Sequence, residues 1–366
     1  MTRKIPSERL CRPVSLWPLV DRKAWTAAME PAGPFDEGKA GAGWSQATWR
    51  KTASGYGFYL SYLDGLGQLD PDERIARRIT HEHLKAYLAY LKQRNHGHTL
   101  HNRIQELGDA LRVLAPEYDW GWVSRAAGRL RAEAVPARDK LSRARPIGEL
   151  IAAGLDFMDH ADGAPGLSPF KRAILYRDGL MVAFLGFDPL RLRSLSCIRL
   201  GHHLQESLGF AILAIPAEYT KGRRPHEAEI AELLRQRLFR YVQHHRPALT
   251  RRRKSGKLPT DYLWVSAQGT PLETISPRVA KATGLSGTPI RPHMFRTCAA
   301  TTVAIRAPKD IHIITPILDH SGPAIGERHY NMAGSLEASR AYARVVNDLR
   351  RGGQPAAYTK QKRMKE

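Results

Sequence analysis

The sequence contains few cysteines, and their spacing gives no reason to pair them. Cys11, Cys197 and Cys298 are the only three among 366 residues, and they lie far apart. This argues against a disulfide framework and a cysteine-based zinc site, and it is typical of a reducing compartment. No apolar run is long enough to span a membrane, and the N-terminus has no signal-peptide hydrophobic region. We therefore expect a cytoplasmic protein with no membrane partner.

The sequence signatures of common cofactors are missing as well. There is no glycine-rich loop of the kind that cradles phosphates, so use of ATP is not expected. The adjacent pairs His202-His203 and His244-His245 suit a single metal poorly, because neighbouring side chains point in different directions. No third ligand accompanies either pair. We expect neither a metal nor another cofactor.

Acidic residues are in deficit. The chain has 57 Lys and Arg against 35 Asp and Glu, which gives a net charge of +22, and the arginines are spread through both halves. Such a balance favours a polyanionic partner, with nucleic acid as the first candidate. A basic soluble protein without such a partner is the plain alternative. The many periodic aliphatic segments argue against a disordered basic chain.

A group of chemistry-bearing side chains lies within forty residues near the C-terminal end. His293 and Arg296 are three residues apart at the start of an expected helix, so they share one face of it. Leu318-Asp319-His320-Ser321 follows, and Tyr330 comes ten residues after His320. Each residue alone has an ordinary explanation, as a solvated helix edge or a packed tyrosine. The ordered set is what carries information.

These residue types suit chemistry on a phosphodiester without a metal. A planar guanidinium group matches the non-bridging phosphate oxygens with two hydrogen bonds. Imidazoles can donate to the same oxygens or move protons near neutral pH. A tyrosine oxygen can act as a covalent nucleophile while the cations stabilise the transition state.

Two cations upstream fit the same chemistry. Arg191 follows a strongly apolar helix expected over residues 169–185 and precedes another apolar stretch, so we expect it to be partly buried. Lys221 lies at the tip of a β-hairpin expected between the apolar runs 210–215 and 228–230. A surface arginine and a flexible surface hairpin are the plain alternatives.

Taken in order, these residues resemble the tyrosine recombinase (phage integrase) family, which carries Arg, Lys, His-x-x-Arg, His or Trp, and Tyr. The resemblance covers about residues 45–345. Arg191 matches the first box because Leu and Ile follow it at the family's offsets of four and seven, and Arg193 is in a competing register. Two positions depart from the pattern: Asp319 replaces the usual Gly, and Ser194 replaces the usual Glu or Asp.

The resemblance implies a mostly α fold with a small β component, forming a clamp around DNA. Its expected parts are an N-terminal arm (1–44, partly ordered), a helical core-binding, SAM-like DNA-binding bundle (45–134), a basic linker (135–147), an α+β catalytic domain (148–351) and a basic mobile tail (352–366). Hydrophobic periodicity predicts the individual elements. Helices are expected at about 45–63, 81–92, 99–114, 148–159, 169–185, 231–244, 275–283 and 335–349, with a further strand at 262–266.

The resemblance also implies the reaction and its residues. Tyr330 would attack a scissile phosphate to give a 3′-phosphotyrosyl link. Arg191, Arg296, His293 and His320 would hold that phosphate, and Lys221 would be the general acid. The implied partners are double-stranded DNA with specific recombination sites, further copies of the chain as a dimer on each site and a homotetramer on paired sites, and other recombinases. Integration or transposition of a mobile element at the nucleoid of a bacterium is the implied setting.

Basic residues outside this set are candidate phosphate contacts. They are Arg50, Lys51, Arg94, Arg103, Lys140, Arg143, Arg145, Arg223, Arg224 and Arg278.

Two alternatives stay open at this point. The same catalytic residues would serve a type IB topoisomerase, which relaxes supercoils as a monomer. The departures at Ser194 and Asp319 would also fit a catalytically weak DNA-binding accessory protein of a recombination system.

Overall fold

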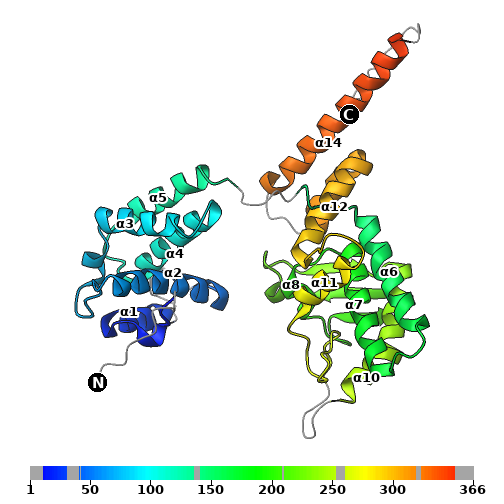
Figure 1. Cartoon of the computed structure of the whole chain (residues 1–366), viewed down its shortest axis with the longest axis horizontal. Helices are drawn as coiled ribbons and strands as arrows, with labels where there is room; N and C mark the ends of the chain where they lie inside the picture. The colour runs from blue at the N-terminus through cyan, green and yellow to red at the C-terminus, as the bar shows by residue number, and fades with distance from the viewer. Residues whose placement is uncertain are drawn as a thin grey trace, which may run out of the picture. The chain divides into compact units, whose positions relative to one another are not determined.

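The computed structural model describes the chain in two compact units, Met1–Asp139 and Lys140–Glu366 (Figure 1). Helices make up 65% and strands 6% of it, which confirms the expected mostly α class with a small β component. None of the described helices is long and apolar enough to cross a membrane. The residues described are 11–30, 41, 43–135, 141–207, 210–252, 260–318 and 323–350.

The first unit is a helical bundle with an aromatic-rich core. Ser45 caps α2 as expected, since its hydroxyl accepts a hydrogen bond from the backbone N–H of Thr48 (3.2 Å). Tyr59 and Tyr87 are fully buried and pack edge to face, with ring centroids 5.1 Å apart. The elements are η1 (Val14–Leu16), α1 (Leu19–Met29), α2 (Gln46–Gly65), η2 (Ile75–Arg78), α3 (His81–Lys92), α4 (His98–Leu114) and α5 (Gly121–Ala132).

The described part of the expected N-terminal arm belongs to this bundle. Trp17 and Trp25 are buried, and Trp17 packs edge to face on Tyr56 at 5.0 Å. The fully buried Asp21 of α1 accepts hydrogen bonds from the hydroxyl of Tyr56 (2.9 Å) and from Nη1 of Arg78 (2.7 Å). Burial raises the pKa of the Asp21 carboxyl, and the guanidinium of Arg78 opposes that shift. The buried ion pair therefore joins α1 to η2, and the hydrogen bond from Tyr56 joins α1 to α2.

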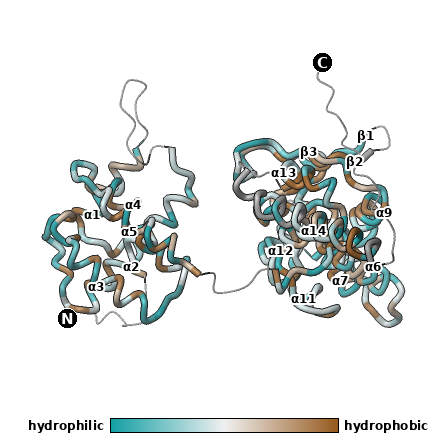
Figure 2. Tube along the Cα trace, turned by 90° about the horizontal axis from the view of Figure 1, so that it is seen from above, coloured by the Kyte–Doolittle hydropathy of each residue, from teal (hydrophilic) through white to brown (hydrophobic). Residues whose placement is uncertain are grey.

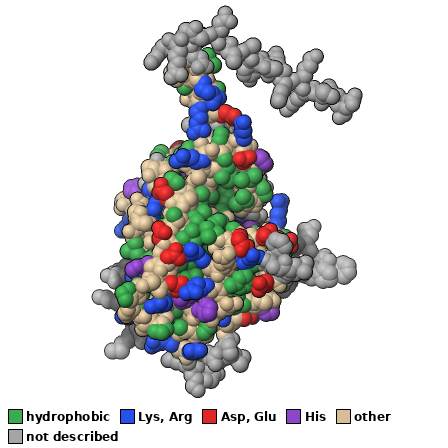
Figure 3. Space-filling model, turned by 90° about the vertical axis from the view of Figure 1, so that its right-hand side faces the viewer, with side chains coloured by type: hydrophobic (Ala, Val, Ile, Leu, Met, Phe, Trp, Pro, Cys, Tyr) green, Lys and Arg blue, Asp and Glu red, His purple; other side chains and the backbone are tan. Residues whose placement is uncertain are grey.

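The second unit consists of helices around a small sheet. Its three strands, β1 (Leu204–Ser207), β2 (Phe210–Ile215) and β3 (His226–Glu229), are antiparallel in the order β1-β2-β3, and the hairpin expected from the sequence is formed by β2 and β3. The sheet lies beside α9 and α13 (Figure 2). Basic and acidic side chains are interspersed on the face drawn in Figure 3. The helices are α6 (Ile147–Gly163), α7 (Pro169–Phe187), α8 (Leu192–Ser196), α9 (Glu232–Arg240), α10 (Arg246–Thr250), α11 (Ile275–Gly284), α12 (Pro292–Arg306), α13 (Ile314–Ile317) and α14 (Pro323–Arg350), with η3 (Ala217–Tyr219), η4 (Tyr241–His245) and η5 (Pro308–Ile313) between them.

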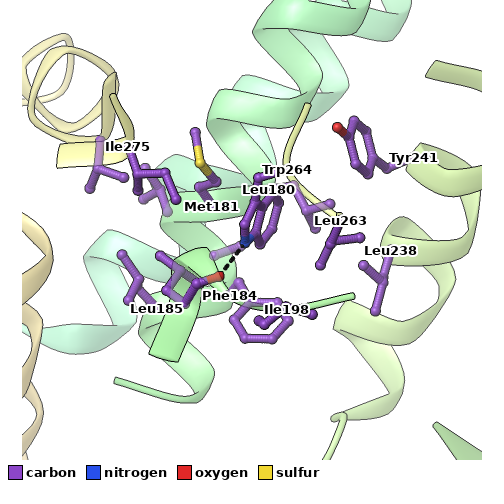
Figure 4. Close-up of a cluster of buried hydrophobic side chains, with 14 of the residues drawn as sticks. Leu180, Met181, Phe184, Leu185, Ile198, Leu238, Tyr241, Leu263, Trp264 and Ile275 are labelled. Carbon is purple, nitrogen blue, oxygen red and sulfur yellow. Dashed lines mark hydrogen bonds between the residues drawn. The ribbon is translucent and has the colours of Figure 1, made fainter. Parts of the chain in front are cut away.

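Helix α7 is the centre of this unit's core, and α6 packs closely along it. A Cβ atom on Gly154 would meet the backbone N of Ala183 at 2.6 Å, so only glycine allows the two helices to approach this far. On the other side, Phe184 packs edge to face on Trp264 (Figure 4). The indole N–H of Trp264 donates to the carbonyl of Leu195 at 2.9 Å, which fixes α8 against this core.

Three element predictions need correction. The strand expected at 262–266 is wrong, because only isolated bridges pair Arg199 with Tyr262 and Val265 with Pro271. That run is apolar because it packs on α7 rather than because it lies in a sheet ladder. The helix expected over 231–244 changes to a π-helical turn at η4. The last helix begins at Pro323 rather than at residue 335, so it includes the backbone of Tyr330.

The buried ion pair in the first unit gives a stability prediction. Asp21→Ala leaves Arg78 as an uncompensated buried charge, so it should lower the free energy of unfolding of this unit by about 3–5 kcal/mol. Asp64→Ala is the matched control, because the Asp64 side chain is 44% exposed beside Arg12 and such pairs contribute about 1 kcal/mol or less. Urea unfolding followed by tryptophan fluorescence measures the difference, since all tryptophans except Trp264 lie in this unit. Equal losses for the two variants would contradict the proposed role of the pair.

Candidate active site

A small pocket in the second unit brings together residues that are distant in the sequence. Two of them are arginines predicted to act on a phosphate, Arg191 and Arg296, and a third is Thr220, which precedes Lys221. The pocket has a volume of about 10 Å³, which is about the space of one water molecule. Its described lining includes two guanidinium groups and no carboxylate, so the charge at the pocket is positive. The lining is formed by Leu190, Arg191, Ser194, Thr220, His226, Arg296 and Ile317.

Arg191 projects from the corner between α7 and α8. It is the N-cap residue of α8, has extended backbone angles and is half-buried, as expected from its sequence context. Arg193, in the competing register, is exposed and does not line the pocket. The corner therefore presents Arg191, and not Arg193, to the pocket.

Arg296 is held from two sides. It lies in the first turns of α12 and is 7% exposed. Its Nη1 donates to the carbonyl of Pro189 at 3.1 Å, and its Nη2 donates to the carbonyl of Leu318. These bonds fix the guanidinium plane between the α7–α8 corner and the end of α13.

Lys221 lies in the connection between β2 and β3. Thr220, the residue before it, holds this turn together through its side-chain hydroxyl. The buried hydroxyl of Thr220 donates towards the carbonyls of Ala217 (3.0 Å) and Arg224 (2.7 Å), and it accepts from the backbone N–H of Arg224 (3.2 Å). Lys221 itself is exposed. The neighbouring Arg223 has a φ of +51°, a conformation that marks a tight turn. A closed turn thus presents the lysine beside the pocket.

Ser194 has a defined role although it is not a carboxylate. Its hydroxyl donates to the carbonyl of Tyr219 at 3.0 Å, and its side chain is buried. This bond joins α8 to the start of the turn that carries Lys221.

The sequence analysis missed one pair at this site. His226, the first residue of β3, lines the pocket, and its Nε2 is 2.8 Å from Oδ2 of Asp188 at the end of α7. The available signal was weak: a histidine shortly after the expected hairpin tip and an aspartate directly after an apolar helix.

The remaining predicted catalytic residues are placed only in part. His293 is exposed in the first turn of α12 and is not among the residues that line the pocket. The prediction for His320 concerns a residue outside the described part of the chain. Tyr330 lies on α14, and its side chain is likewise outside that part.

Two of the predicted DNA contacts in the first unit are engaged by one acidic residue. The buried Glu106 accepts from Nη1 of Arg103 (2.7 Å) and lies 3.7 Å from Nζ of Lys51. Arg94 lies over the ring of Tyr90, with 4.2 Å from Cζ to the ring centroid, and Arg50 is exposed. The α2–α4 surface is therefore partly neutralised.

The DNA contacts predicted in the second unit also divide into cations with partners inside the protein and cations that are exposed. Arg145 donates to the carbonyls of Thr283 (3.2 Å) and Ser286 (3.1 Å), so it fastens the start of this unit to the end of α11. Arg278 pairs with Asp178 at 3.3 Å. The exposed members are Arg143, Arg223 and Arg224, and Lys140 lies outside the described residues.

A basic groove between α3 and α5, which we call the α3–α5 groove, was not predicted. Lys85 on α3 and Arg125 and Arg129 on α5 line it, and all three are exposed. The half-buried Trp122 stacks on His81 there, with ring centroids 4.0 Å apart. Among the described residues that line it there is no acid. Arg125 and Arg129, four residues apart on one helix, were the signal in the sequence, but only the packing shows that Lys85 of α3 faces them.

Comparison with known proteins adds no assignment: no protein-family model and no curated protein matches this chain.

The pocket geometry predicts which arginine binds an oxyanion. Inorganic phosphate should raise the unfolding temperature of the second unit, and Arg191→Ala should remove most of that effect. A concentration ten times the Kd corresponds to about 1.4 kcal/mol. Arg193→Ala is the control because it removes the same charge two residues away. Differential scanning calorimetry in phosphate and in chloride of equal ionic strength makes the measurement. A loss of the phosphate effect in the Arg193 variant alone would show that Arg193, and not Arg191, binds the anion.

Proposed function

We propose that this chain is a DNA strand-cutting and rejoining enzyme of the tyrosine recombinase type, a site-specific recombinase or integrase. The observation that supports this best is the convergence of Arg191 and Arg296 on one pocket, with the turn that carries Lys221 beside it. The two observations are of different kinds: one is the order of the residues along the chain, and the other is that two of them meet in the fold.

In the proposed reaction the tyrosine oxygen of Tyr330 attacks the scissile phosphorus. A bond forms between that oxygen and phosphorus, and the bond from phosphorus to the 5′ oxygen breaks. The electron pair of the broken bond goes to the 5′ oxygen, which takes a proton from the Lys221 ammonium. The phenol proton passes to a base, for which His293 is the candidate. Resealing reverses these steps and needs no ATP, because the phosphotyrosyl link conserves the bond energy.

Arg191 and Arg296 would bind the non-bridging oxygens of that phosphate, together with His293 and His320. Guanidinium groups that are already held in place lose little freedom when charge develops, so they stabilise the transition state more than the ground state. The hydrogen bonds of Arg296 to two carbonyls are such a restraint.

The first unit would be the core-binding domain of the proposed clamp around DNA. Its α3–α5 groove offers Lys85, Arg125 and Arg129 without a neutralising acid in the described lining, which is what a phosphate backbone requires. Double-stranded DNA with specific recombination sites is the proposed substrate, and a mobile element in the bacterial cytoplasm, at the nucleoid, is the proposed setting.

The proposed assembly is a dimer on each site and a homotetramer on paired sites, with other recombinases as further proposed partners. The C-terminal half of α14 supports a contact with a second copy. Tyr342 (72% exposed), Val345 (44%) and Val346 (41%) form an apolar stripe at helical spacing that the described residues of the same chain leave uncovered.

The nucleophile can be tested with a suicide DNA substrate that is nicked near the crossover. Wild type should form a covalent protein–DNA adduct on a denaturing gel, and Tyr330→Phe should form none, because it lacks the attacking oxygen. Tyr262→Phe, which removes a phenol oxygen elsewhere in the same unit, should form the adduct normally. Binding without an adduct in wild type would leave the accessory DNA-binding role. An adduct without junction formation between two marked sites would indicate a type IB topoisomerase.

The DNA surface of the first unit can be tested by salt dependence. The double variant Arg125→Gln/Arg129→Gln should weaken binding and lower the slope of log K against log salt by about 2, since each lost phosphate contact lowers it by about 0.9. Lys51→Gln/Arg103→Gln removes the same charge next to Glu106 and should change the slope by less than half as much. Fluorescence anisotropy over a salt series measures both. Equal slope changes would argue against the α3–α5 groove as the contact surface.

A further inference from the structure

We infer that Asp188 and His226 form a positioning pair that holds Lys221 at the scissile phosphate. This inference rests on the proposed function, and it adds a role that the order of catalytic residues does not contain. Neither residue belongs to the ordered set found in the sequence. Asp188 lies at the α7–α8 corner that carries Arg191, and His226 lies at the end of the turn that carries Lys221.

The pair links the end of α7 to the start of β3 through a side-chain hydrogen bond. Nε2 of His226 is 2.8 Å from Oδ2 of Asp188, and both side chains are nearly buried, at 14% and 13% exposed. A hydrogen-bonded pair with this little exposure is screened only weakly by solvent, so its geometry is well defined. Asp188 is the C-cap residue of α7, directly after Phe187, and His226 is the first residue of β3.

The turn that carries Lys221 is therefore anchored at both ends to the same corner. At its start, Ser194 of α8 donates to the carbonyl of Tyr219. At its end, His226 binds Asp188. Thr220 closes the turn between these anchors by bonding Arg224. If the second anchor is lost, the turn keeps its internal bonds and the backbone of His226 stays paired with Ile215 in the sheet, but the turn no longer has a side-chain link to Asp188.

The corner that receives the second anchor also holds the arginines. The carbonyl of Asp188 accepts from the backbone N–H of Leu190 at 2.7 Å, and the carbonyl of the intervening Pro189 accepts from Arg296. Arg191 follows directly. The pair thus links the proton donor to the two phosphate-binding arginines through three consecutive residues, Asp188, Pro189 and Leu190.

A residue that acts by placing the proton donor has a specific chemical signature. When the 5′ bridging oxygen of the scissile phosphate is replaced by sulfur, the leaving group is a thiolate, which departs without a proton because its pKa is about 8.5. Removing the general acid then lowers the cleavage rate on the sulfur substrate only slightly. Removing a phosphate-binding arginine lowers the cleavage rate on the sulfur substrate as much as on the oxygen substrate.

The experiment measures cleavage rates on matched oxygen and sulfur substrates for wild type, His226→Ala and Asp188→Asn. On the oxygen substrate we expect a decrease of up to about 100-fold, the cost of misplacing a reacting group by about 1 Å. On the sulfur substrate we expect rates near wild type. The ratio of the two rates does not depend on the folded fraction, so partial unfolding of a variant cannot imitate the result. Asp188→Asn keeps the size of the side chain and tests the pair a second way if His226→Ala folds poorly.

Three reference variants complete the design. Lys221→Ala should give the largest ratio of sulfur to oxygen rates, and adding His226→Ala to it should not raise the ratio further. Arg191→Ala should lower both rates together. His202→Ala is the matched control, because this exposed histidine lies 3.5 Å from Asp261 in the same unit and should leave both rates unchanged.

The outcomes separate the inference from the proposed function. Wild type that cleaves neither substrate overturns both. Wild type that cleaves, with a His226 variant equally slow on oxygen and sulfur, overturns the positioning role and places His226 on the phosphate itself. A His226 variant as fast as wild type on both substrates also overturns it.

Discussion

The corner between α7 and α8, which carries the candidate site, is held by the buried cation of Arg296. A guanidinium group removed from water is costly unless its N–H groups are hydrogen-bonded. Arg296 meets this requirement with the carbonyls of Pro189 and Leu318, and in doing so it joins α12 to the α7–α8 corner and to the end of α13. Arg296 thus lines the pocket and also sets the shape of the corner. Substitutions of Arg296 will change fold and binding together, which is why Arg191 is the better probe of the pocket.

The short helix α8 beside the pocket follows the same pattern, in which side chains bind backbone carbonyls of other segments. Ser194 donates to the carbonyl of Tyr219, and Trp264 donates to the carbonyl of Leu195, so two successive residues of α8 are held by hydrogen bonds to other segments. A short helix of this kind has little stability of its own, and its position comes from these contacts. Ser194 therefore has a defined structural contact at this corner.

Much of the fold and part of the site could be predicted from the sequence. Caps and apolar periodicity located α2, α3 and α7 well, because these are local properties of the chain. The apolar run that contains Trp264 was wrongly predicted as a strand, since its burial depends on packing against α7, which periodicity does not show. The contact of Asp188 with His226 could not be predicted either, because two ordinary residues in separate elements meet only through the fold.

Net charge alone does not identify the cations that are available to DNA. Many of the basic residues in this chain are used internally: Arg103 by Glu106, Arg278 by Asp178, and Arg145 by backbone carbonyls. With Lys51, which also lies beside Glu106, at least four of the ten residues predicted as DNA contacts therefore have structural partners. Arg125 was not predicted and has no acid in the described lining of its groove. A cation next to a buried carboxylate adds little to the field outside the protein, whereas like charges facing each other across a groove reinforce it. The positions of the acidic residues, more than the number of basic ones, decide where a polyanion can bind.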